Sequence, residues 1–543
     1  MKTSIHSFTL IAFTTVVLTS FTTQKVKAES TLTKYGAIAK AESLIPLRPG
    51  IPGKSPFWNG SAHQFIYAPA FDYKPIAGAV NYLYKITCED KTTHHFSNKV
   101  PYAALSEAWK TMPTGFFELR VIAQDKSGDS IGLAGSGKYY KAAFFNGPYH
   151  QPVMPYDKSA EIALNNLLHK DYVEYWITNK VPDPDYQYYR YPAKIYSALI
   201  VGAVTHARLK PNTPDAERSI QLARIVADYL IGISFREGSV WEFFPPTYYG
   251  PRIKNNPGSH MNLTTNFTIM GADAGNAYLD LYDYTGEVKY LDAAKRIAAT
   301  YLKNQMDKGS WYLFVNYETG APLAENIVIP TAPVNYFIRL KKDYKVEGLE
   351  QMTEKAMNWI MENPVKTFNW QGQFEDVKAF EPYKRQSREQ ACDMAVYLFN
   401  NKGNIALAEE LVRFAEDQFV IWEKPIPIIV KNNVPDPENV RGWDSKNWIT
   451  PSVQEQYGFF MPVNRTAAIM IETYWAAYTA TKKEIYLAKA KSIANAITLV
   501  QKEHDGDYPT MFTKYKMNFW LNSVVYPAKT MMKLEKNLQQ LKK

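Results

Sequence analysis

Two kinds of predicted helix alternate along the chain from residue 157 onward. One kind is charged and amphipathic, and the other is apolar nearly all round. A helix with one polar face lies at the outside of a domain, whereas a helix that is apolar on all sides is enclosed. The alternation therefore predicts an all-α (α/α)6 toroid over 157–540. The outer helices are expected over 161–179, 215–234, 290–305, 349–363, 404–422 and 484–503, and the inner ones over 191–207, 263–284, 330–340, 386–399, 461–478 and 511–532.

The connections between these helices differ in length. Inner helices lead into the next outer helix through short turns, whereas most returns from outer to inner helices are long, as at 235–262, 306–329, 364–385 and 423–460. In an alternating toroid all the long connections emerge on one face, around the N-terminal ends of the inner helices. Long loops without regular structure are usually functional. The sequence thus predicts a working face.

Ahead of the helices, residues 56–146 show apolar alternation of period two, in short runs bounded by Gly, Pro, Asp or Ser. This pattern predicts β-strands. The phrases Gly78-Ala-Val-Asn-Tyr and Gly115-Phe-Phe-Glu-Leu-Arg-Val resemble a fibronectin type III or immunoglobulin-like domain. We expect an N-terminal all-β sandwich over 44–146 without catalytic residues.

The N-terminus reads as a signal peptide over 1–28, with Lys2, an uncharged stretch and the small residue Ala28 at the cleavage point. Its apolar core is too short to span a membrane, and no lipid-anchor cysteine follows, so a periplasmic or secreted protein without membrane insertion is expected. Cys88 and Cys392 are far apart, which argues against a disulfide framework.

The net charge of +9 is dispersed, so a nucleic-acid partner is not expected. No His, Cys or carboxylate spacing indicates a metal, and no phosphate loop is present, so no cofactor is predicted. Homo-oligomerisation is left open.

Aromatic residues make up 14% of the chain, and many lie in the long loops. Their flat faces suit sugar rings, and loop arginines match a carboxylate, which predicts a glycan with acidic sugars as partner. The alternative for each is a structural role, in the core or in an ion pair. The predicted substrate-binding residues are Trp241, Tyr248, Tyr249, Arg252, His260, Arg388, Arg441, Trp443, Trp448 and Arg465.

Glycoside hydrolysis needs a carboxylic acid and usually a second carboxylate. The predicted catalytic residues are Glu242, Glu455 and Asp444, with Glu375 and Asp376 as further candidates on the loop face. Trp241 and Phe243 flank Glu242, and this apolar setting is expected to raise its pKa. Helix capping or an arginine partner is the alternative for each carboxylate.

The segments Pro56-Phe-Trp-Asn, Tyr67-Ala-Pro-Ala-Phe-Asp and Trp241-Glu-Phe-Phe-Pro-Pro-Thr-Tyr-Tyr-Gly carry a family resemblance. The helical part resembles the six-hairpin superfamily of glycoside hydrolases and polysaccharide lyases, and the whole chain resembles two-domain proteins of polysaccharide-using bacteria. The nearest family in this resemblance is a β-glucuronidase type, glycoside hydrolase family 154. It implies hydrolysis of a terminal glucuronic acid, with Glu, Arg and Trp residues in the site.

Two other functions remain open from the residues. A polysaccharide lyase or uronate epimerase needs a Tyr or His base and a group that neutralises the uronate. Tyr248, Tyr249, Arg252, His260 and Asn262 would supply such a set. A non-catalytic glycan-binding protein is the third candidate.

Overall fold

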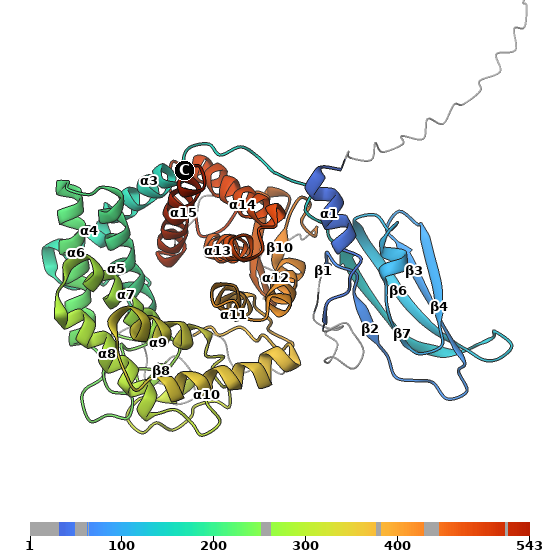
Figure 1. Ribbon diagram of the computed structural model, residues 1–543, viewed down its shortest axis with the longest axis horizontal. Helices are drawn as coiled ribbons and strands as arrows, with labels where there is room; N and C mark the ends of the chain where they lie inside the picture. The colour runs from blue at the N-terminus through green and yellow to red at the C-terminus, as the bar shows by residue number, and fades with distance from the viewer. Residues whose placement is uncertain are drawn as a thin grey trace, which may run out of the picture.

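The computed structural model describes residues 32–48, 62, 64–250, 262–375, 382–427, 445–515 and 520–543. The predicted signal peptide lies outside these residues. Within them, no helix has both the length and the apolar character needed to cross a membrane. The chain folds into a strand-rich N-terminal domain and a larger ring of helices (Figure 1).

The N-terminal domain is built on a five-stranded sheet in the order β1-β7-β6-β3-β4. Its strands pair antiparallel except β1, which runs parallel to β7. A second sheet pairs β2 with β5, and Phe71 of β2 packs on Tyr139 of β7 with ring centroids 4.9 Å apart. The elements are α1 (Lys34–Glu42), β1 (Gln64–Phe65), β2 (Ala70–Asp72), β3 (Asn81–Cys88), β4 (Thr93–Asn98), β5 (Tyr102–Ala104), α2 (Ser106–Trp109), β6 (Gly115–Gln124) and β7 (Ser130–Lys141).

The prediction of strands in this region is confirmed, but the second layer of the expected sandwich is small. Only three residues on each of β2 and β5 pair there. Part of the remaining face is covered by α2, whose Trp109 is buried and donates its indole N–H to the carbonyl of Ile66 at 3.0 Å. The likeness to a fibronectin type III domain stays a prediction.

The helices after residue 156 pair as hairpins of one outer and one inner helix in the described chain. The inner helices α5, α7, α9, α11, α13 and α15 each contact the next, and α15 contacts α5, so the ring closes. The first hairpin has its outer helix split into α3 and α4. The helices are α3 (Tyr156–Leu168), α4 (Asp171–Asn179), α5 (Pro192–Leu209), α6 (Pro214–Gly232), α7 (Met270–Thr285), α8 (Val288–Lys303), α9 (Thr331–Tyr344), α10 (Glu350–Ile360), α11 (Glu389–Asn400), α12 (Ile405–Phe419), α13 (Asn464–Thr481), α14 (Glu484–Glu503) and α15 (Asn522–Leu541).

The local sequence explains both kinds of helix. Residues Ile195–Ala207 of α5 are buried on every side, as expected for an enclosed helix, whereas α6 buries one stripe only. Pro214 occupies the first position of α6, and the hydroxyl of Thr213 accepts a hydrogen bond from the Ala216 N–H at 3.2 Å. A proline at the first turn after a capping threonine starts a helix without losing a backbone hydrogen bond.

Three inner helices begin later than predicted. The expected starts at 263, 461 and 511 are replaced by Met270, Asn464 and Asn522. The residues ahead of these helices form short strands or bridges instead. β8 (Thr265–Phe267) pairs with β9 (Phe314–Asn316) of the next loop, β12 (Phe459–Pro462) pairs with β11 (Ser452–Gln456) of its own loop, and β11 also pairs with β10 (Val420–Ile421). Met511, ahead of α15, forms a bridge with Val463. Apolar runs in short strands and in buried helix ends look alike in sequence.

The long connections gather on one face, as predicted, because each one contacts the next around the ring. The loop before α7 meets the loop before α9 through β8 and β9, and Gln373 links the latter to the loop before α11. An isolated bridge from Ser387 to Gln456 and one from Val463 to Met511 continue the chain of contacts. The Trp520 indole then donates to the Tyr188 hydroxyl at 2.8 Å, and the Tyr249 N–H donates to the Arg190 carbonyl at 3.0 Å.

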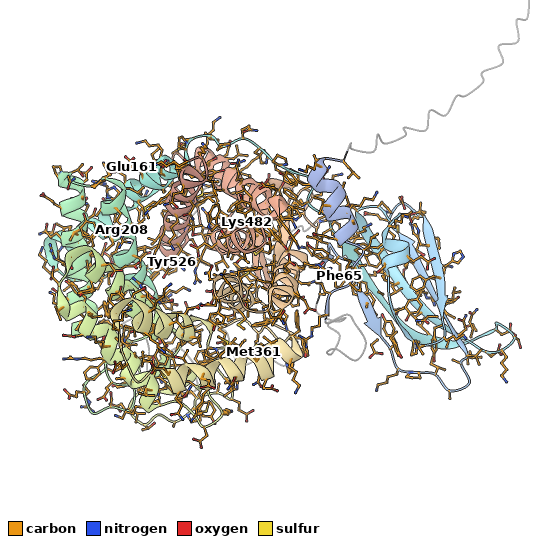
Figure 2. The ribbon with its side chains drawn as sticks, viewed as in Figure 1. Phe65, Glu161, Arg208, Met361, Lys482 and Tyr526 are labelled. Atoms are coloured by element: carbon orange, nitrogen blue, oxygen red, sulfur yellow. The ribbon has the colours of Figure 1, made fainter. Side chains whose placement is uncertain are left out.

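The two domains meet at α12. The Asp417 carboxylate accepts hydrogen bonds from the Ile66 and Tyr67 N–H groups at 2.6 and 2.7 Å. The guanidinium of Arg413 lies 4.4 Å from the centre of the Tyr67 ring. Figure 2 labels Phe65 where the sheet domain faces the ring.

Candidate active site

A pocket lies where the N-terminal turns of all the inner helices converge, and we call it the ring-centre pocket. Helix N-termini carry partial positive charge and unpaired N–H groups, so their convergence favours anionic side chains and ligands. Tyr526 of α15 is labelled in Figure 2. The pocket is lined by Lys194, Ile269, Met270, Asp273, Ala332, Gln373, Phe374, Glu375, Glu389, Gln390, Asp393, Arg465, Asn522 and Tyr526.

Two ion pairs hold the wall of this pocket. The Lys194 Nζ lies 2.5 Å from the Glu375 Oε1, and the Arg465 Nη2 lies 2.6 Å from the Glu389 Oε1. The Arg465 guanidinium also lies 5.2 Å from the centre of the Tyr526 ring. Because each cation already has a carboxylate partner, the pairs fix the wall rather than leave two uncompensated positive charges.

Two further carboxyl groups of the pocket have raised pKa values. Burial raises the pKa of Asp273 to about 6, although Arg465 opposes the shift. Burial, with help from the negative charge of Glu389, raises the pKa of Asp393 to about 7. The negative charge of Asp273 also contributes to the raised pKa of Asp393. Both groups can therefore hold or release a proton near neutral pH.

Glu389 behaves in the opposite way. Burial would raise its pKa, but Arg465 and Arg388 outweigh burial and lower it. The ionised Glu389 thus lies beside Asp393, whose carboxyl group keeps its proton to a higher pH. The difference between the two pKa values comes from their surroundings. The Thr331 hydroxyl donates to the Asp393 Oδ2 at 3.0 Å and orients that carboxyl group.

Tyr526 is a poor proton acceptor in this setting. Burial raises its pKa, with Asp273 adding to the shift and Arg465 opposing it. A phenol with a raised pKa stays protonated at neutral pH, so its role is to donate a hydrogen bond. In the described part of the chain, the carboxylates do not form a group that could hold a metal ion.

The structure corrects the reasoning for Glu242. Its carboxylate accepts from the Gly238 N–H at 2.8 Å and pairs with Lys303 at 3.1 Å. These two contacts lower its pKa, so the expected rise beside Trp241 and Phe243 is wrong. Trp241 turns into the core, where it packs on Phe244 and Tyr301, and the half-buried Phe243 ring lies 5.2 Å from the Arg296 guanidinium. Glu242 does not line the ring-centre pocket.

Several predicted binding residues are buried below the loop face and pack in the core of the protein. Trp241 and Tyr248 are buried, and the Tyr248 hydroxyl donates to the Glu375 carbonyl. Trp448 packs in a small apolar cluster with Ile421 and Met461. Tyr249 is half-buried and hydrogen-bonded to Tyr229. None of these rings lines the ring-centre pocket.

Arg388 and Glu455 form one structural contact. The buried Arg388 guanidinium donates to the main-chain carbonyl of Glu455 on β11 and to the Ser387 hydroxyl at 3.2 Å. Of the predicted residues, Arg465 and the further candidate Glu375 line the ring-centre pocket in the described chain. The predicted Arg252, His260, Arg441, Trp443 and Asp444, with Asp376, lie outside the described residues.

Sequence reasoning missed Lys194, Asp273, Glu389 and Asp393. The predicted catalytic carboxylates all come from loops, whereas these four residues lie near the N-terminal ends of the inner helices. A signal was present, because a charged residue in a helix that is otherwise apolar all round is costly to bury without a purpose.

No protein-family profile and no curated protein sequence matches the chain. Among solved structures, a family 76 glycoside hydrolase from a bovine Bacteroides thetaiotaomicron strain matches with 9% identity and a TM-score of 0.46, over 88% of this chain and 98% of that one. Cellobiose 2-epimerase from Spirochaeta thermophila matches with 10% identity and a TM-score of 0.46, over 70% and 98%. An unsaturated glucuronyl hydrolase specific for heparin matches with 11% identity and a TM-score of 0.40, over 71% and 97%.

Proposed function

We propose that the chain is a glycoside hydrolase whose proton-transferring groups are Asp273 and Asp393. The observation that carries this proposal is the pair of carboxyl groups with raised pKa values in one pocket, beside a third carboxylate held ionised by arginine. Hydrolysis of a glycosidic bond needs one carboxyl group protonated and another ionised at the same pH.

Both raised pKa values fit proton transfer near neutral pH, and we give the acid role to Asp393, the group with the higher one. Asp393 keeps its proton to about pH 7 and donates it to the leaving oxygen as the glycosidic bond breaks. Asp273 loses its proton at about pH 6 and serves the attack on the anomeric carbon, as the nucleophile or as the base for a water. Glu389 stays ionised and supports the positive charge that develops on the sugar. Thr331 holds Asp393 in place.

The charge of the sugar is a separate question. Both cations on the wall of the ring-centre pocket are already paired with carboxylates, Lys194 with Glu375 and Arg465 with Glu389, which favours a neutral sugar. The β-glucuronidase reading, family 154 included, is the second candidate, and the presence of Lys194 and Arg465 favours it. A uronate would then have to replace Glu375 or Glu389 as the partner of one cation. Action outside the cytoplasm, after removal of residues 1–28, belongs to the same proposal.

The test is a panel of matched aryl glycosides and glycan oligosaccharides, neutral and uronic, incubated with wild type, Asp273→Asn and Asp393→Asn. We expect reducing ends to appear with wild type and to fall by about 10² to 10⁴ with either variant. Asp292→Asn on the outer helix α8 is the matched control and should keep full activity. A product with a new double bond would instead establish the lyase reading, and full activity of both variants would overturn the assignment of the pair.

A further inference from the structure

A second, wider depression opens beside the ring-centre pocket, and we call it the amide groove. Its internal volume is about 410 Å³, compared with about 40 Å³ for the ring-centre pocket. The groove therefore offers the larger space beside the proposed reacting groups. It is lined by Glu325, Asn326, Ile327, Ile329, Trp359, Asn363, Pro364, Thr367, Asn369, Gln371 and Gln373.

Gln373 belongs to both walls and joins the two spaces. Its Oε1 accepts from the Ile329 N–H at 2.9 Å, and its Nε2 donates to the Ile327 carbonyl at 3.0 Å. These bonds tie the loop before α9 to the loop before α11. The fixed Gln373 side chain is therefore the shared wall between the groove and the pocket that holds the proposed reacting groups.

Three asparagine side chains of the groove, Asn326, Asn363 and Asn369, have amide atoms that the described residues do not bond. The Asn369 Oδ1 accepts from the Tyr383 N–H at 3.0 Å and the Gln386 Nε2 at 3.1 Å, while its Nδ2 has no partner among the described residues. The Asn363 Nδ2 donates to the Trp359 carbonyl at 2.8 Å, while its Oδ1 has none there. The Asn326 Oδ1 is buried without a partner. The wall thus offers both donors and acceptors, which is what sugar hydroxyls require.

Trp359 supplies an aromatic wall in the same groove. It lies near the end of α10, is half-buried, and is followed by a π-helical turn, Met361–Val365, that contributes Asn363 and Pro364 to the lining. Such turns occur often at functional sites. An aromatic ring beside half-used amides combines an apolar face for C–H groups with polar partners for hydroxyls.

The groove also differs from the ring-centre pocket in charge. Glu325 is the one ionisable residue in its described lining, and no Lys or Arg is among those residues. A uronate placed there would meet a carboxylate and no cation, which disfavours acidic sugars.

We propose that the amide groove binds a neutral sugar unit next to the unit whose bond is cleaved, so that the substrate is an oligosaccharide or polysaccharide. Cleavage of the neighbouring unit rests on the proposed hydrolase function, whereas binding in the groove does not depend on catalysis. Trp359 supplies the stacking face, and Asn363 supplies an acceptor for a hydroxyl.

The test measures binding and turnover separately on the full chain. Cellotetraose, mannotetraose, xylotetraose and tetragalacturonate are titrated calorimetrically against Asp393→Asn, alone and combined with Trp359→Ala, Trp359→Phe or Asn363→Ala. We expect one of the neutral tetrasaccharides to bind, Trp359→Ala to weaken it about tenfold, and Trp359→Phe to restore most of the affinity. Trp475→Ala, in a half-buried Trp of α13 that lines a different pocket, is the matched control and should change nothing.

Turnover then separates this inference from the proposed function. In an otherwise wild-type chain, Trp359→Ala should raise KM for the tetrasaccharide more than KM for an aryl glycoside of one sugar unit, whereas Trp475→Ala should change neither. Binding that depends on Trp359 without any hydrolysis would reject the hydrolase and keep the groove. Equal binding by Trp359→Ala, no binding of any neutral tetrasaccharide, or tighter binding of tetragalacturonate would overturn the groove, whatever the activity.

Discussion

The ring buries carboxylates in two regions that serve different purposes. Glu416 and Asp417 lie on α12, on the side that faces the sheet domain (Figure 1), and Asp273 and Asp393 lie in the ring-centre pocket. Burial raises the pKa of Asp417 to about 7, the same value as for Asp393. A raised pKa therefore does not distinguish a structural carboxylate from a chemical one in this molecule.

The hydrogen-bond partners do distinguish them. Asp417 accepts from the Ile66 and Tyr67 N–H groups and from the Gln418 Nε2 at 2.6 Å. Glu416 is bound by the Lys489 Nζ at 2.7 Å, the Tyr474 hydroxyl at 2.9 Å and the Trp422 indole at 3.1 Å. Each carboxylate is surrounded by fixed donors, so Asp417 joins the two domains and Glu416 joins α12 to α13 and α14.

The carboxyl groups of the ring-centre pocket accept few hydrogen bonds from the described residues. Asp393 accepts one hydrogen bond, from Thr331, and Asp273 accepts none from the described residues. Both border an opening, so a substrate can supply what the protein does not. Buried carboxylates saturated by fixed donors stabilise structure, and buried carboxylates with spare lone pairs at an opening are available for chemistry.

The largest expected effect is on turnover. Asp393→Asn should lower kcat by about 10² to 10⁴ while the midpoint of thermal unfolding stays the same or rises, because the change removes a general acid without breaking a saturated network. Steady-state kinetics and calorimetry of the same preparation check both halves. A large loss of stability in this variant would break the comparison.

The corresponding experiment on the structural carboxylates changes Glu416 on α12. Glu416→Gln leaves Lys489 buried without its counter-ion, since their side chains are 1% and 2% exposed. We expect the free energy of unfolding to fall by about 3–5 kcal/mol, as for other broken buried pairs. Urea unfolding measures it. A catalytic defect without loss of stability would show that Glu416 does not belong to the structural group.

The pH dependence of kcat/KM sharpens the assignment within the pocket. The rate should rise as Asp273 loses its proton at about pH 6 and fall as Asp393 loses its proton at about pH 7. The optimum therefore lies between these values, and the two limbs report the coupled pair. A profile flat from pH 5 to 8 would contradict this assignment.

The smallest expected effect concerns the one donor on Asp393. Thr331→Val removes a hydrogen bond that lowers the pKa of Asp393, so the alkaline limb should move to higher pH. A net hydrogen bond of about 0.5–1.5 kcal/mol corresponds to about 0.4–1.1 pH units. The acid limb should move less. Thr353→Val on α10, whose hydroxyl bonds only the Leu349 carbonyl, is the matched control.

The sequence by itself determined the hairpin ring, the strand-rich N-terminal part and the face that carries the loops. Hydrophobic periodicity is local, so it can be read along the chain before anything is packed. Amphipathic helices such as α8 and enclosed helices such as α5 differ within their own residues, and their order sets which loops are long. The helix starts at Met270 and Asn522 were missed, because pairing between distant loops decided them.

Only the tertiary structure decided the site. Lys194, Asp273, Asp393 and Arg465 are ionisable residues on four different helices, and they meet because the ring closes. Glu242 shows the converse: its neighbour Trp241 turns into the core, and the contacts with Gly238 and Lys303 lower its pKa instead. The pKa of a side chain depends on what surrounds it in space, and that information is absent from neighbouring letters of the sequence.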